Sequence, residues 1–127
     1  MTNRDPALPK GSAVIVDLGS IAPPGAPGAV WSAPHGGDLD ANLVRLHSRG
    51  SITEHVNDDV DVLIFVQSGR GELTVDGETH RLRRDVLALI PRGARRQIAA
   101  GQTGICYLSV HRRRGLLSIA GRPGLTR

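Results

Sequence analysis

The stretch "GSITEHVNDDVDVLIFVQSG" (residues 50–69) decides the fold of this chain. It begins and ends with glycine, and it carries His55, with Asn57 two residues further on. Acidic residues then lead into an apolar run, Val62–Val66. Because this run shows no alternation of apolar and polar residues, we expect a central strand with both faces buried. The stretch therefore places a β-strand directly after residue types that commonly hold metals.

Length and cysteine usage indicate a small cytoplasmic domain. The chain has 127 residues, enough for one hydrophobic core, and its single cysteine, Cys106, cannot form an internal disulfide. Residues 1–10 lack the apolar region of a signal peptide. No apolar run approaches the roughly 20 residues that span a bilayer. We therefore expect one cytoplasmic domain with no membrane partner.

Charge is distributed unevenly along the chain, whose formal net charge is +4. No acidic residue follows Asp85, whereas many arginines do: Arg92, Arg95, Arg96, Arg112, Arg113, Arg114, Arg122 and Arg127. A basic region can attract phosphates, but the chain has only three aromatic residues with which to stack bases. Nucleic acid is therefore not an expected partner, and we interpret the basic end as solvated.

Short β-branched and leucine-rich runs, separated by glycine and proline, recur along the chain and predict strands rather than helices. The predicted strands are residues 13–18, 29–32, 41–47, 51–56, 61–68, 71–77, 78–83, 85–91, 95–100 and 104–112. Asp76-Gly77 is a dipeptide typical of a type I′ hairpin turn. Short strands separated by turns at such close spacing are typical of an antiparallel sandwich or barrel.

Three segments follow from this pattern. Residues 1–38 form an amino-terminal extension with one or two covering strands and a Pro/Gly-rich linker at 21–30. Residues 39–114 form the barrel, and residues 115–127 form a basic carboxy-terminal tail.

The stretch 50–69 resembles the first conserved motif of the cupins, which are small β-barrels of jelly-roll topology. That motif consists of a glycine, a His-x-His pair, a glutamate and a closing glycine. The corresponding residues here are Gly50, His55, Asn57, Val62 and Gly69, with Gly50 one residue closer to His55 than in the family motif.

A second stretch, "DVLALIPRGARRQIAA" (85–100), resembles the second cupin motif. Pro91 and Gly93 match its Pro-x-Gly, whereas Asp85, Arg96 and Ala100 replace its glycine, histidine and asparagine. The resemblance implies an all-β fold, a double-stranded β-helix or jelly-roll barrel in a single domain. It also implies that the scaffold residues are kept and that most metal ligands are not.

The metal-ligand positions of the motifs are largely replaced in this chain. Of the four positions that hold the metal in metal-binding cupins, only His55 keeps its ligand. Val62 offers no donor atom, and Arg96 would place a positive charge beside a cation. We therefore expect no cofactor. If a bulge turned Asp61 inward, the alternative set His55, Asn57 and Asp61 could hold a divalent transition metal.

Without a metal, the barrel mouth would be a small-molecule pocket. His55, Asn57 and Arg96 suit the carboxylate or phosphate of a small ligand, because the guanidinium supplies a forked donor pair. Val62 and Ile64, together with Val66 and Ile98, would line the rest of the pocket. The leading hypothesis is a cupin that binds or senses a small organic anion.

Further polar residues could join this pocket. Tyr107, Ser109 and His111 share one face of the last strand by alternation, and that face lines the pocket or meets water. Cys106 lies on the opposite, apolar face, which favours an inert buried thiol.

Three alternatives stay open. Arg96 could fill the barrel, paired with Asp61 or Glu54, and close the pocket. The chain could be an enzyme, either a metal-dependent dioxygenase with a degenerate site or a metal-free isomerase with His55 as general base. It could also be an interaction protein that acts through residues 54–61 or its basic end. No catalytic residue can be assigned from the sequence.

A homodimer is the expected assembly. The two-sided apolar strand 61–68 and the predicted strand 13–18 both require a second surface, and residues 13–18 could pair across the interface.

Overall fold

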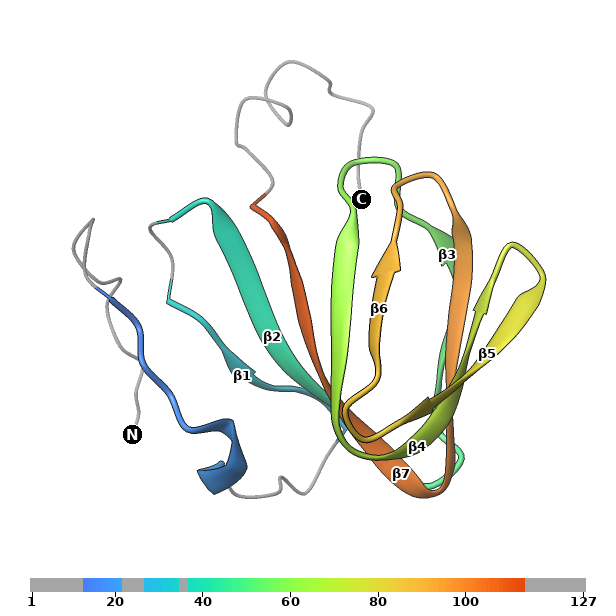
Figure 1. Ribbon diagram of the computed structural model, residues 1–127, viewed down its shortest axis with the longest axis horizontal. Coiled ribbons are helices and arrows are strands. Elements are labelled where there is room, and N and C mark those ends of the chain that lie inside the picture. The colour runs from blue at the N-terminus through green and yellow to red at the C-terminus, as the bar shows by residue number, and fades with distance from the viewer. Residues whose placement is uncertain (1–12, 22–26, 35–36, 114–127) are drawn as a thin grey trace.

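The computed structural model describes residues 13–21, 27–34 and 37–113 (Figure 1). The predicted tail at 115–127 and residues 22–26 of the Pro/Gly-rich linker lie outside the described residues. The described elements are η1 (Leu18–Ser20), β1 (Gly28–Ser32), β2 (Leu39–Leu46), β3 (Ser51–Val56), β4 (Val62–Val75), β5 (Glu78–Arg83), β6 (Leu87–Ile90) and β7 (Arg95–Arg112). Within this part of the chain, no helix is long and apolar enough to cross a membrane.

The strands form an antiparallel barrel of two facing halves. Hydrogen bonds connect them in the order β1-β2-β7-β4-β5, with β3 added to β7 and β6 added to β4. One half contains β1, β2, β6, the start of β4 and the end of β7. The other half contains β3, β5, the end of β4 and the start of β7. The fold is thus the all-β barrel that the motifs predict.

The long strands β4 and β7 join the two halves by bending at the bottom of Figure 1. The sequence predicts two strands in place of each, 61–68 and 71–77 for β4 and 95–100 and 104–112 for β7, and this division is wrong. The strands bend without ending the ladder, and register shifts occur at Gln67, between Val66 and Ser68, and at Arg70, between Gly69 and Gly71. Gly69 has a φ of 84°, a conformation that favours glycine.

The Asp76-Gly77 hairpin is confirmed. Both residues have positive φ, 49° and 86°, as a type I′ turn requires. The turn fixes the β4–β5 register from Val75 opposite Glu78 down to Arg70 opposite Arg83.

The core lies between the two halves. Its buried residues are Leu46, Val60, Val62, Ile64, Val66, Leu73, Leu82, Ile90, Ala94, Ile98, Ala100, Ile105 and Tyr107. The expectation that both faces of strand 62–66 are buried holds only for the inner face. Val62, Ile64 and Val66 are buried, whereas Leu63 and Phe65 on the outer face are half-buried.

The predicted strand at 13–18 is wrong. Residues 13–17 are in no strand, and the short helix η1 begins at Leu18, with Asp17 Oδ1 accepting a hydrogen bond from Gly19 N. The apolar residues of this segment are exposed, Ile15 by 93%. Among the described residues they join no sheet.

Candidate functional site

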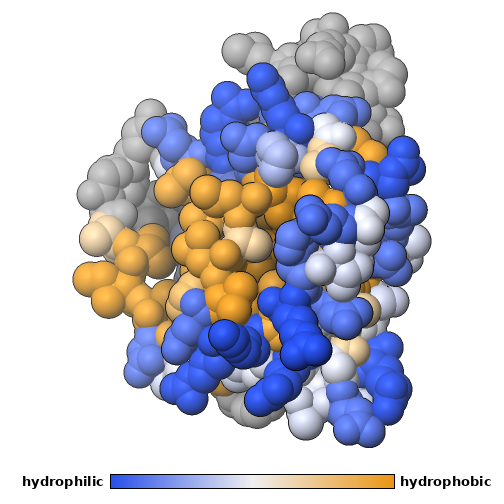
Figure 2. All heavy atoms as spheres, turned by 45° about the vertical axis from the view of Figure 1, so that its right-hand side comes forward, coloured by the Kyte–Doolittle hydropathy of each residue, from blue (hydrophilic) through white to orange (hydrophobic). Residues whose placement is uncertain are grey.

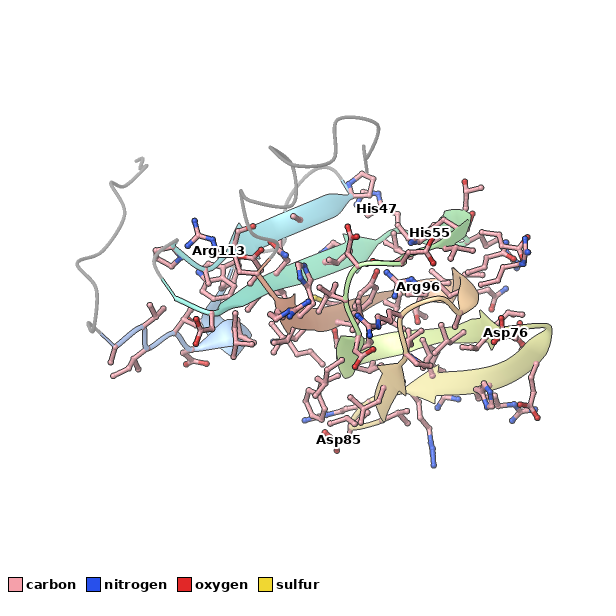
Figure 3. All side chains as sticks on the ribbon, turned by 90° about the horizontal axis from the view of Figure 1, so that it is seen from above. His47, His55, Asp76, Asp85, Arg96 and Arg113 are labelled. Carbon is pink, nitrogen blue, oxygen red and sulfur yellow. The ribbon has the colours of Figure 1, made fainter. Side chains whose placement is uncertain are left out.

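The centre of the candidate site is a pair of side chains on neighbouring strands. His55 of β3 lies directly opposite Arg96 of β7 in the ladder. Arg96 Nε donates a hydrogen bond of 3.2 Å to His55 Nε2. Figure 3 shows the two residues together between the strands, while Asp76 and Asp85 lie apart from them. The structure therefore brings together two of the residues that the motifs single out.

Two hydrogen bonds fix the ring of His55. Its Nδ1 lies 2.9 Å from the carbonyl oxygen of Thr53, which can only accept. Its Nε2 faces Arg96 Nε, which can only donate. Both contacts are hydrogen bonds at the same time in the tautomer that carries its proton on Nδ1 and turns its Nε2 lone pair to the guanidinium.

Val62 and Asp61 have opposite orientations. Val62 is 3% exposed and belongs to the core, so the position of the family glutamate faces the barrel interior. Asp61 is exposed, and its Oδ1 accepts a hydrogen bond of 2.8 Å from Arg92 N. The alternative register that would turn Asp61 into the site is therefore wrong.

The candidate metal set is not assembled in the part of the chain that the structure describes. No three His, Cys, Asp or Glu side chains are grouped there to hold a metal ion. The alternative set of His55, Asn57 and Asp61 fails because Asp61 binds the turn before β7 instead. That the protein works without a metal stays a prediction.

Asn57 shapes a loop through its side-chain oxygen. Its Oδ1 accepts hydrogen bonds from Asp59 N (2.9 Å) and Val60 N (3.3 Å), which turns the chain from β3 toward β4. Its backbone oxygen also accepts from Gly93 N. Since these bonds occupy both of its oxygens, only its amide NH₂ is offered to a ligand.

Tyr107 extends the site into the barrel. Its side chain is buried, and burial raises the pKa of its hydroxyl to about 12, although the nearby positive charge of Arg96 acts in the opposite direction. Strand alternation places Ser109 and His111 on the same inner face, beside Ile64 and Val62 of β4. Tyr107 is buried in the core, whereas Ser109 and His111 are half-buried, so that this polar face lines a pocket stays a prediction.

The remaining predicted lining residues are packed. Ile64 is 3% exposed and belongs to the closed core with Val66 and Ile98. Cys106 is a free, buried thiol, as expected, and burial raises its pKa, an effect that Arg45 partly opposes. It faces away from Tyr107 and takes no part in the site.

Comparison with known families agrees with this architecture. Residues 42–111 match the family model described as a cupin domain, which covers more than half of the chain. This chain is a cupin. No functionally curated protein matches this cupin.

Solved structures resemble this cupin in fold. TT1209 from Thermus thermophilus has a TM-score of 0.67 and 21% identity, covering 80% of this chain and 98% of its own. A double-stranded β-helix protein from Klebsiella pneumoniae has a TM-score of 0.67 and 19% identity, with 80% and 90% covered. KdgF from Halomonas sp. has a TM-score of 0.62 and 22% identity, with 68% and 80% covered. At these identities the likeness shows the fold alone.

The sequence reasoning missed one arrangement of charged residues. Arg70 and Arg83 lie directly opposite each other on β4 and β5. The signal was available, because counting outward from the Asp76-Gly77 turn pairs these two residues.

Proposed function

We propose that this cupin binds a small organic anion at the barrel mouth, through Arg96 with His55 and Tyr107. The observation that carries the proposal is the hydrogen bond between Arg96 and His55. Both residues stand at metal-ligand positions of the cupin motifs, so a positively charged guanidinium occupies the place of a histidine that binds the metal cation in the family motif. A fixed positive charge there favours an anion.

The chemistry of the three groups suits a carboxylate ligand. A guanidinium binds a carboxylate with two parallel hydrogen bonds, and it stays charged at all physiological pH values. Tyr107 adds a hydroxyl that is protonated at neutral pH and can donate a hydrogen bond. The neighbouring apolar core gives the site low polarity on its inner side.

An isomerase that uses His55 as general base is the weaker alternative. The structures that resemble this cupin include a putative sugar phosphate isomerase from Acidithiobacillus ferrooxidans, at 19% identity. A general base needs a free lone pair, but that of His55 Nε2 accepts the bond from Arg96. Catalysis by His55 would require this hydrogen bond to break, whereas anion binding does not, and we therefore favour binding.

A homodimer is the second part of the proposal. An apolar row, Phe65, Leu108 and Leu87, crosses the outer face of β4, β7 and β6 in register, and it ends at Leu43 of β2, which is already buried within the chain. Leu87 and Leu89 of β6 are 54% and 68% exposed. Figure 2 shows a continuous hydrophobic region in the centre of the face it displays. A second copy would bury such a surface, with residues 13–17 as a further apolar contribution.

The binding proposal is tested by titration calorimetry with a panel of mono- and dicarboxylic acids and sugar acids. We expect at least one acid to bind saturably and the variant Arg96→Gln to weaken it about tenfold or more. The matched control is Arg95→Gln, which removes the neighbouring exposed arginine and should leave binding unchanged. Equal binding by Arg96→Gln and the unaltered protein would refute the proposal.

A further inference from the structure

A second candidate site lies on the β4–β5 ladder, away from the barrel mouth. A groove of about 890 Å³ is lined there by Arg70, Gly71, Glu72, Arg81, Leu82, Arg83, Val86, Ala99, Ala100 and Gly101. Arg96, at the barrel mouth, pairs with Val75, the last residue of β4, whereas the groove lies around Arg70 of the same strand. Five residues of strand separate Val75 from Arg70, which corresponds to about 16 Å. The groove and the barrel mouth are therefore separate.

Like charges face each other in this groove. Arg70 and Arg83 are directly opposite in the antiparallel ladder, so their side chains leave the sheet on the same face. Arg81 follows on that face, opposite Glu72. Directly opposed like charges destabilise a strand pair unless a counter-charge lies between them.

The protein itself supplies little counter-charge. Glu72 is the one acidic residue among the groove's lining residues, against three arginines. The ion pair found nearby on β5 joins His80 to Glu78 instead. Among the described residues, the side chains of Arg70, Arg81 and Arg83 make no hydrogen bond or ion pair. Their donors are therefore available to a ligand.

Small residues keep the space between the arginines open. Gly71, Ala99 and Gly101 contribute at most a methyl group to the groove. The strands also pack too closely here for larger residues, because a Cβ on Gly101 would lie 3.3 Å from the carbonyl oxygen of Arg70. A ligand can thus approach the floor between the guanidinium groups.

We propose that this groove binds the phosphoryl group of a small ligand between Arg70 and Arg83, with Arg81 as a third contact. Cross-strand neighbours have Cβ atoms about 5 Å apart, so both guanidinium groups can reach one anion. A tetrahedral phosphoryl group offers three oxygens and about two negative charges, so it can accept paired hydrogen bonds from two guanidinium groups. A carboxylate, by contrast, accepts its pair of hydrogen bonds from a single guanidinium. No aromatic residue lines the groove, so it has no platform on which to stack the bases of a nucleic acid.

Pyrophosphate is the probe that tests this site, titrated calorimetrically at constant ionic strength in the millimolar range. We expect saturable binding that weakens about tenfold in Arg83→Gln and in Arg70→Gln, since each variant removes one charged donor pair. Arg95→Gln, an exposed arginine outside the groove, should bind as the unaltered protein does. Arg96→Gln should also bind normally, which separates this site from the proposed function of the barrel mouth.

Three results would overturn the proposal. The first is no saturable binding of pyrophosphate. The second is a loss in Arg95→Gln equal to that in Arg83→Gln, which would indicate general attraction to a basic surface. The third is tighter binding of single-stranded DNA than of pyrophosphate with a strong salt dependence, which would indicate a nucleic-acid surface. Thermal unfolding of each variant confirms that it is folded.

Discussion

Arg96 Nε donates a hydrogen bond of 3.2 Å to His55 Nε2, so two residues at metal-ligand positions of this cupin bind each other. The bond requires an unprotonated Nε2, and Thr53 requires a proton on Nδ1. A protonated imidazole could no longer accept from the guanidinium. The arrangement of the site is therefore linked to one tautomer of one ring.

The tautomer of His55 is the first prediction. Nitrogen-15 spectra of the histidine rings, recorded at a pH where the imidazoles are neutral, should show Nδ1 of His55 protonated and Nε2 unprotonated. His47, whose ring makes no hydrogen bond among the described residues, serves as the control and should show an average of both tautomers. A His55 ring that is protonated on Nε2 would contradict the hydrogen-bond pattern described above.

Late ionisation of Tyr107 is the second prediction. Burial raises the pKa of this group, the only tyrosine of the chain, to about 12. An unfolded tyrosine loses its proton near pH 10, so between about pH 10 and 12 the unfolded chain binds fewer protons than the native one. The free energy of unfolding should then fall with rising pH, by up to about 3 kcal/mol. Below this window Tyr107 should cause no pH dependence.

The ultraviolet absorbance of tyrosinate, followed together with circular dichroism, measures both events. Because the charge of Arg96 favours the tyrosinate, Arg96→Gln should move the ionisation to still higher pH, while Arg95→Gln should not. Ionisation near pH 10 in a chain that is still folded would show that Tyr107 is not buried beside Arg96.

The inward orientation of Val62 gives the third prediction. Val62→Glu should lower the free energy of unfolding by about 3 kcal/mol or more, because it places a carboxyl group in the apolar core. The matched control is Val56→Glu on β3, where the side chain is 42% exposed and the cost should stay near 0.5 kcal/mol. Urea unfolding of the two variants measures the difference. Equal costs would mean that Val62 does not face the core.

The glycine bends of β4 give the fourth prediction. Gly69 has positive φ, and a Cβ there would overlap the backbone of Gly104, so Gly69→Ala should cost about 3–5 kcal/mol. Gly77 also has positive φ, but a Cβ there meets open space, so Gly77→Ala should cost only about 1–2 kcal/mol. Thermal or urea unfolding separates the two effects. A similar cost at both positions would show that the close approach of the strands at Gly69 can relax.

The sequence predicts the barrel because local signals and motif spacing agree. The Asp76-Gly77 dipeptide fixes its hairpin through backbone conformation alone, and the motif glycines mark real bends. Asp61 shows the limit of this reasoning. A one-residue change of register decides whether it or Val62 faces the interior, and long-range contacts settle the choice: Val62 packs in the core, and Asp61 binds Arg92 N, from a segment 31 residues away.

Residues 13–18 show a second limit. The segment has strand-like composition, but a strand needs a partner edge, and composition does not say which edge is available. Among the described residues this segment pairs with no strand, and its apolar side chains are exposed.

The exposed apolar surface gives the last prediction, which concerns the proposed homodimer. Sedimentation equilibrium at micromolar concentration should return a dimer. Ile15→Asp and Leu89→Asp should each raise the dissociation constant at least tenfold, because burying a large aliphatic side chain contributes about 1.5–3 kcal/mol and a two-fold interface contains each residue twice. Val56→Asp, which alters an exposed valine of β3 outside this surface, should leave the dimer intact. A monomer in the unaltered protein would remove the homodimer, whereas an effect of Leu89→Asp without one of Ile15→Asp would restrict the interface to the outer face of β6.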